Sequence, residues 1–122
     1  MRIATTPRPQ EHTWIWLAKI ASGVVVFAIL AIHLVVNHMV ASGGLLSYAD
    51  VVAYYANPIV PVMEGSFLVF VVCHALLGVR GIALDLNPRP AIVRAMDIAL
   101  AALGIVAVGY GLSLLATIAY RA

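Results

Sequence analysis

The residues best suited to chemistry lie in one run of an otherwise apolar chain, His74-Ala75-Leu76-Leu77-Gly78-Val79-Arg80-Gly81-Ile82-Ala83-Leu84-Asp85. In a helix that advances about 100° per residue, Gly78 lies about 40° from His74 and Gly81 lies about 20° to the other side. An imidazole beside two residues without side chains leaves a flat slot against the backbone. Such a slot suits a planar macrocycle that is ligated through imidazole, as haem is. The alternative is that His74 hydrogen-bonds a neighbouring helix and the glycines permit close packing.

Two charged residues accompany this run. Asp85 falls about 20° from His74 around the helix and marks the end of the stripe. Arg80 lies off the stripe, about 7 Å from Asp85 along the helix axis. We expect Arg80 either to extend toward the membrane surface or to pair with a buried propionate.

An earlier segment carries a second polar stripe. Ser22 and Asn37 each fall within about 40° of His33 on a helix. His33 is either a second axial ligand or a polar group that packs against a partner helix, and the sequence leaves both open. His38 lies about 140° around the helix from His33, so the two cannot bind one metal from the same face. We expect His38 to sit near the outer end of its helix, where water satisfies it.

The composition explains why these polar residues stand out. Of the 122 residues, 64% are apolar and 10% are charged, whereas a soluble domain is nearer half apolar and a quarter charged. The net charge of +2 gives no argument for nucleic acid. Cys73 is the single cysteine, so a disulfide framework is excluded. The sequence has no paired nucleophile and base, phosphate loop or CxxC motif, which argues against hydrolysis or group transfer by this chain alone.

The spacing of the charges predicts an all-α membrane protein of one domain. A spanning helix needs roughly 20 apolar residues, and we predict three spans, at about 16–41, 62–84 and 95–120, with a short interfacial helix at 45–56. Ser42-Gly43-Gly44 should end the first span, and Asn87-Pro88-Arg89-Pro90 should form the turn before the third. Glu64 and Asp97 should lie in the first turns of the second and third spans, where the helix dipole favours negative charge. Gly104, Ala107, Gly109 and Gly111 give the third span a small-residue face for close packing.

Positive charge predicts the orientation. Lysine and arginine flank the amino terminus and the connection between the second and third spans, whereas the connection between the first two spans has neither; the basic residues concerned are Arg2, Arg8, Lys19, Arg80, Arg89 and Arg94. Because such residues favour the cytoplasmic face, we expect the amino terminus and the second connection to be cytoplasmic in an inner (cytoplasmic) membrane.

The pattern H-A-x-x-G-x-R-x-x-x-x-D from His74 to Asp85 resembles the second-helix signature of the membrane-anchor subunits of succinate dehydrogenase (succinate:quinone oxidoreductase, respiratory complex II). The resemblance extends to the chain length and the three spans. In the first helix, Ser22-Gly23 matches part of the family's R-x-S-G pattern, with Ile20 in place of the arginine. Fumarate reductase anchors look similar.

The resemblance implies specific roles. His74 would ligate haem b, Arg80 would lie near the haem propionates and the quinone, and Asp85 would lie beside the quinone pocket. Ser22 would be a quinone neighbour, and His33 resembles the outer-haem ligand of anchors that carry two haems. The sequence does not separate one haem from two. Leu86 stands where several family members have a tyrosine that contacts the quinone.

The family's architecture implies the partners. This chain would form half of a heterodimeric six-helix bundle with a second small membrane-anchor subunit, embedded in membrane lipid. An iron–sulfur subunit and a flavoprotein subunit would dock on the cytoplasmic side, and succinate would be oxidised there, in another subunit. Electrons would then reach a quinone through this anchor. The alternatives are a fumarate reductase anchor, a haem-free helical scaffold, or a small transporter subunit that uses His33, His74 and Arg80 as a proton path.

Overall fold

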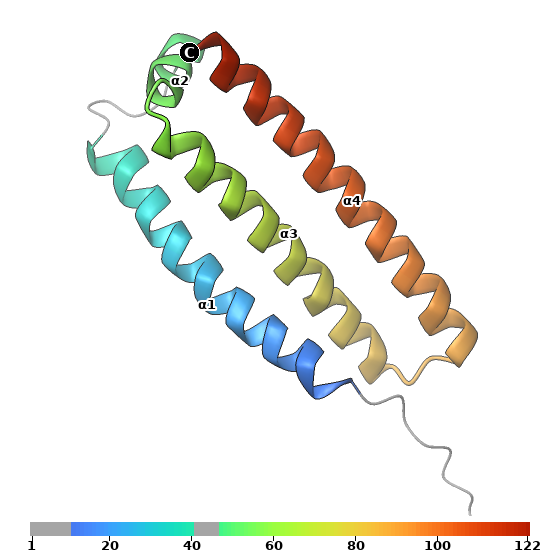
Figure 1. Cartoon of the computed structure of the whole chain (residues 1–122). Helices are drawn as coiled ribbons and strands as arrows, with labels where there is room; N and C mark the ends of the chain where they lie inside the picture. Colours follow the sequence, from blue (N-terminus) through green and yellow to red (C-terminus); the bar gives the residue numbers. More distant parts are fainter. Residues whose placement is uncertain (1–10, 41–46) are drawn as a thin grey trace, which may run out of the picture.

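The computed structural model describes residues 11–40 and 47–122, and within them every regular element is helical. Figure 1 shows a row of three long helices, α1 (Thr13–Val35), α3 (Ile59–Asp85) and α4 (Pro90–Arg121). A π-helical turn, η1 (Val36–Val40), continues α1, and the short helix α2 (Tyr48–Tyr55) lies at the end of the bundle where α3 begins. The long helices have mean hydropathies of 2.4, 2.2 and 2.2 over their most apolar stretches, so each is long and apolar enough to cross a membrane.

α3 is the central helix of the row. It packs against α1 on one side and α4 on the other, whereas the described parts of α1 and α4 make no significant contact with each other. The chain direction alternates, so the start of α1, the end of α3 and the start of α4 share one end of the bundle, which we call the hairpin end (Figure 1). The only buried hydrophobic residues in the described ranges are Val60 and Leu84. This pattern fits a chain whose apolar side chains face lipid or partner helices.

α4 packs closely on α3 through Gly104 and Gly111, as predicted, whereas a methyl group at Gly109, on the same predicted face, would meet no atom within 4 Å. Added methyl groups at Gly104 and Gly111 would lie 2.8 Å from Leu76 Cδ1 and 2.5 Å from Leu68 Cδ2, respectively. An added methyl group at Gly65 of α3 would likewise lie 3.4 Å from Leu112 Cδ2 of α4. Leucine side chains of one helix therefore occupy the space that glycines leave on the other.

All three long helices begin earlier than the charge pattern predicts, α1 at Thr13 rather than at about residue 16. α3 begins at Ile59, three residues before the predicted span, and α4 begins at Pro90 rather than near residue 95. Proline is tolerated in the first turn because its missing N–H has no helical partner there. Glu64 and Asp97 therefore lie beyond the first turns, which hold no acidic residue. The prediction that they complement the helix dipoles is wrong, and both have side-chain partners instead.

The two connections differ in what can be described. Between α3 and α4 the chain turns at Asn87, which adopts the left-handed conformation with φ of 51°, a region that asparagine tolerates better than most residues. α2 starts with a capping box, in which Ser47 and Asp50 bond each other's backbone N–H groups. The predicted interfacial helix at 45–56 corresponds to α2, but residues 45 and 46 lie outside the described ranges. The predicted stop at Ser42-Gly43-Gly44 lies outside them as well.

Candidate haem and quinone site

His74 lies in the interface between α3 and α1, where its ring is held by hydrogen bonds to α1. Its Nδ1 is 3.1 Å from the Lys19 carbonyl oxygen and 3.2 Å from Ser22 Oγ. Ser22 Oγ itself donates to the same carbonyl at 2.9 Å. A carbonyl oxygen can only accept, so Nδ1 must carry the proton and donate. The neutral ring then has its lone pair on Nε2, for which the described part of the chain supplies no hydrogen-bond partner.

Gly23 makes room for this ring. A methyl group at Gly23 would lie 2.9 Å from His74 Cε1 and 3.4 Å from Nδ1, which is closer than the 3.5–4.0 Å of ordinary carbon contacts. The Ser22-Gly23 pair thus acts as one unit, because the serine bonds the imidazole and the glycine admits it. Ser22 is buried in this contact, with 8% of its surface exposed.

The slot predicted along His74, Gly78 and Gly81 is only partly open. A methyl group at Gly78 would meet no atom within 4 Å. A methyl group at Gly81 would lie 2.9 Å from Lys19 Nζ, so that position is covered by the lysine. Lys19 is held over Gly81 by an ion pair with Glu11 at 2.9 Å. Open space therefore exists one turn from His74, at Gly78, but not one turn further on.

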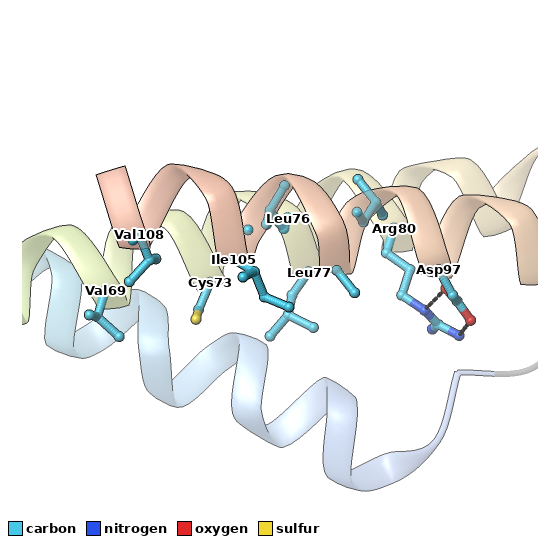
Figure 2. Close-up of a pocket in the computed structure, with 12 residues that line it drawn as sticks. Val69, Cys73, Leu76, Leu77, Arg80, Asp97, Ile105 and Val108 are labelled. Carbon is cyan, nitrogen blue, oxygen red and sulfur yellow. Dashed lines mark hydrogen bonds and ion pairs between the residues drawn. The ribbon is translucent and has the colours of Figure 1, made fainter. Parts of the chain in front are cut away.

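Arg80 does not lie with His74. It points toward α4, where its Nε and Nη2 donate to the two carboxylate oxygens of Asp97 at 2.7 and 3.3 Å (Figure 2). Its Nη1 is buried and has no acceptor in the described ranges. Asp85, which the sequence places on the His74 stripe, is exposed at the end of α3. The structure thus separates the predicted site residues between two faces of α3 and its end.

His33 belongs to a separate polar cluster in the other half of the bundle. His33 Nδ1 lies 2.8 Å from Glu64 Oε1, and Asn37 Nδ2 donates to His33 Nε2 at 3.0 Å. The ring also stacks on Phe67, with centroids 5.5 Å apart. Both ring nitrogens are therefore engaged by this chain. Tyr54 of α2 donates to the same Glu64 oxygen at 3.5 Å.

Two tyrosines of α2, Tyr54 and Tyr55, have raised pKa values beside this cluster. Burial, followed by the nearby Glu64 carboxylate and Tyr54, raises the pKa of Tyr55 to about 12. Burial, the charge of Glu64 and the hydrogen bond to it also raise the pKa of Tyr54. His38 stands apart from the cluster: it is exposed, and its Nδ1 lies 3.2 Å from the carbonyl oxygen of Leu34 in its own helix.

Sequence reasoning did not single out three of these residues. Gly23 was visible only as the partner of Ser22 in a motif, and Glu64 and Asp97 were assigned to helix ends. The described residues contain no cluster of three or more histidine, cysteine, aspartate or glutamate side chains that could hold a metal ion. A metal ion bound to the described residues would therefore need a further ligand from outside them, or would have to be held by a macrocycle such as a porphyrin.

Comparison with known proteins decides the family. The model of the succinate dehydrogenase/fumarate reductase transmembrane subunit matches residues 2–116, which is nearly the whole chain. The chain belongs to this family. Family membership agrees with the helical fold and makes this chain a membrane subunit.

Two relatives illustrate the likeness. The succinate dehydrogenase 2 membrane subunit SdhC of Mycobacterium tuberculosis is 35% identical over 81 residues, which cover 66% of this chain and 59% of the relative. The succinate dehydrogenase hydrophobic membrane anchor subunit of Archaeoglobus fulgidus is 33% identical over 72 residues, which cover 59% and 61% of the two chains. The matches thus span about three fifths of the length of these curated relatives. No solved structure matches the chain.

Proposed function

We propose that this chain is a membrane-anchor subunit of succinate:quinone oxidoreductase, that it binds haem b together with a second anchor subunit, and that it forms part of the quinone site. Membership of the transmembrane-subunit family and the names of both relatives support the anchor role. Those names also favour succinate oxidation over fumarate reduction as the direction in which the complex works. Haem binding rests on the geometry of His74.

The contacts of His74 fit an axial ligand. Metal-ligating histidines almost always donate their second ring N–H to a carbonyl, a carboxylate or water, which fixes the tautomer and the ring orientation. The Lys19 carbonyl and Ser22 receive that proton here, so Nε2 presents its lone pair. Gly78 leaves open space one turn away on the same face of α3. Glu64, the partner of His33, lies ten positions before His74 on α3, which is about 15 Å along the helix axis. His33 is therefore too far from His74 to bind the same iron, and the iron's other ligand would come from the second anchor subunit.

When bound, haem b supplies a one-electron redox centre within the membrane. The chain's own residues orient one ligand, keep its proton on Nδ1 and surround it with apolar helix. The predicted contact of Arg80 with the propionates has no support from its neighbours, because its guanidinium is paired with Asp97. The haem proposal therefore rests on His74, Ser22, Gly23 and Gly78.

The contacts of His33 favour a single haem. An axial ligand must offer an unprotonated, unpartnered nitrogen to iron. Glu64 and Asn37 engage the two nitrogens of His33 within this chain, so a second haem at His33 would require this cluster to open. The separation of about 15 Å between His33 and His74 also argues against the transporter alternative. No hydrogen bond in the described ranges links the His33 cluster to His74, as a proton path would require.

The hairpin end suits the docking of the soluble subunits. Asp85 is exposed there, as are Arg89 and Arg94, and the basic residues predict that this end is cytoplasmic. The iron–sulfur and flavoprotein subunits would dock on this end of the anchor pair. A quinone reduced there would lie near Asp85 and would take its protons from the cytoplasm.

Replacement of His74 tests the proposal directly. His74→Ala should abolish the b-type band in reduced-minus-oxidised spectra of the purified complex, because the iron loses a ligand. His38→Ala is the matched control and should leave the band intact, since His38 is exposed and bonded to its own helix. An unchanged band in His74→Ala would remove this residue from the assignment. A wild-type complex without a Soret band would favour the haem-free scaffold.

A further inference from the structure

An apolar groove of about 730 Å³ runs between α3 and α4 and is lined by residues of these two helices. Figure 2 shows it beside Val69, Cys73 and Leu77 of α3, with Ile105 and Val108 of α4 opposite. Small residues of α4, Ala101 and Gly109, line this space, and a methyl group at Gly109 would meet no atom within 4 Å. His74, Ser22, Gly23 and Gly78, on which the haem proposal rests, do not line this groove.

The groove extends through one leaflet of a membrane. From Arg80 to Val69 it spans eleven residues of α3, which is about 16 Å along the axis, about half of the roughly 30 Å hydrocarbon core. Beyond this depth the helices close together, because Leu68 packs on Gly111 and Leu112 packs on Gly65. The groove therefore begins at the hairpin end and ends near the midplane. A partner helix that crosses the membrane would not match this half-length recess, whereas the acyl chain of one leaflet would.

The mouth of the groove carries a net positive charge. The Arg80–Asp97 pair closes it (Figure 2), and Arg80 retains a buried Nη1 without an acceptor. Arg94 is exposed three residues before Asp97 on the same helix. Asp85 does not offset these charges at the mouth, because it lies about 140° around α3 from Arg80. Glu11 also lies close enough to Arg80 to interact with it electrostatically, but Lys19 pairs with Glu11 at 2.9 Å. With Arg94, which lies one turn before Asp97 and does not line the groove, this end has three basic side chains for two carboxylates.

We propose that this groove binds an anionic phospholipid, with one acyl chain against α3 and α4 and the phosphate at Arg80 and Arg94. Guanidinium groups bind phosphate through charge-assisted hydrogen bonds, and basic residues next to the membrane attract anionic lipid. A neutral headgroup such as a quinone would leave the excess positive charge without a counter-ion. On the proposed orientation the lipid belongs to the cytoplasmic leaflet. The site does not depend on haem binding.

Photolabelling of the intact complex tests the site. The complex is reconstituted in phosphatidylcholine vesicles that contain a trace of phosphatidylglycerol with a diazirine in one acyl chain. After illumination, mass spectrometry of the digest should locate adducts on the residues that line the groove. A phosphatidylcholine probe with the same acyl chain should label these residues about fivefold less, since one basic residue is worth about that factor in affinity for anionic lipid.

Two neighbouring alanines provide a matched pair of variants. Ala101 lines the groove, whereas Ala102 is exposed and does not. Ala101→Leu should reduce the adduct about tenfold by filling the groove, and Ala102→Leu should leave it within about twofold. Arg94→Gln should remove most of the preference for phosphatidylglycerol.

Three outcomes would overturn the proposal. Equal labelling by the two probes would show that the charge at the mouth selects nothing. Loss of the adduct on addition of a prenylquinone would assign the groove to the quinone tail. Absence of any adduct in wild type, or an adduct that Ala101→Leu leaves unchanged, would show that another subunit covers the groove. Haem content is measured in the same samples, so failure of the haem proposal can be recognised separately.

Discussion

Substitution of Gly23 tests whether the His74 ring occupies the position described. In Gly23→Ala the new methyl group would lie 2.9 Å from Cε1, against an ordinary contact of about 3.5–4.0 Å. The ring must therefore move by about 0.6–1.1 Å, or α1 and α3 must separate by a similar distance. The bond from Nδ1 to the Lys19 carbonyl is already 3.1 Å long, so such a movement takes it beyond the usual range of up to about 3.2 Å.

The size of the effect follows from these two losses. Overpacking of this kind costs about 1–3 kcal/mol, and a hydrogen bond contributes about 1 kcal/mol more. Disturbance of the groups that orient a metal ligand typically lowers metal affinity by about 10–100-fold. We therefore expect Gly23→Ala to lower the haem affinity of the complex by about 10–100-fold, with smaller effects on assembly.

The assay is the transfer of haem from the purified complex to apomyoglobin, followed by the absorbance of the b-type band per flavin. Gly109→Ala is the matched control, because a methyl group there meets open space on α4. Normal haem retention in Gly23→Ala would refute the reasoning. Equal loss in both variants would show that the effect is a general one on helix packing.

Three further outcomes follow from the structure. His33→Ala should leave the b-type band per complex unchanged, because Glu64 and not iron engages its ring; loss of about half the band in difference spectra would indicate a second haem. Asp97→Asn removes the carboxylate that pairs with Arg80, at a cost of about 1.5–3 kcal/mol in stability. It should therefore lower the thermal unfolding midpoint more than Asp85→Asn does; equal midpoints would contradict this. In an ultraviolet pH titration Tyr55 should ionise near pH 12. Because the pKa of this tyrosine in the unfolded chain is about 10, the free energy of unfolding should fall as the pH rises from about 10 to about 12. Glu64→Gln should move this ionisation toward pH 10, and an unchanged midpoint would show that burial alone is responsible.

The sequence predicts the elements of this fold well, because long apolar segments and proline-containing turns are local signals. It predicts helix starts less well. Pro90 reads as part of a turn, yet it is the first residue of α4, where a proline is favourable. This extension moves Asp97 from a helix end to a position inside α4 that faces Arg80.

Side-chain partners depend on how each helix is rotated and on its register with its neighbour. Helices that are apolar on all sides carry no hydrophobic stripe to fix the rotation, so the pairs His33–Glu64 and Arg80–Asp97 could not be assigned. One signal was present. Arg80 lies seven residues before Asn87 and Asp97 lies seven residues after Pro90, so an antiparallel hairpin about the turn predicted from the sequence places them at one level. The contact of His74 with α1 has no such marker, because α2 and the undescribed residues 41–46 intervene.

The central claim is that iron porphyrin lies against α3 with His74 as an axial ligand. A cryo-electron microscopy map of the assembled complex in membrane nanodiscs tests it most directly. The account predicts tetrapyrrole density whose iron is bonded to Nε2 of His74, with the macrocycle over Gly78 and the Nδ1 proton still shared with α1. Side chains of an adjoining helix in the space over Gly78, with no macrocycle in contact with α3, would contradict it.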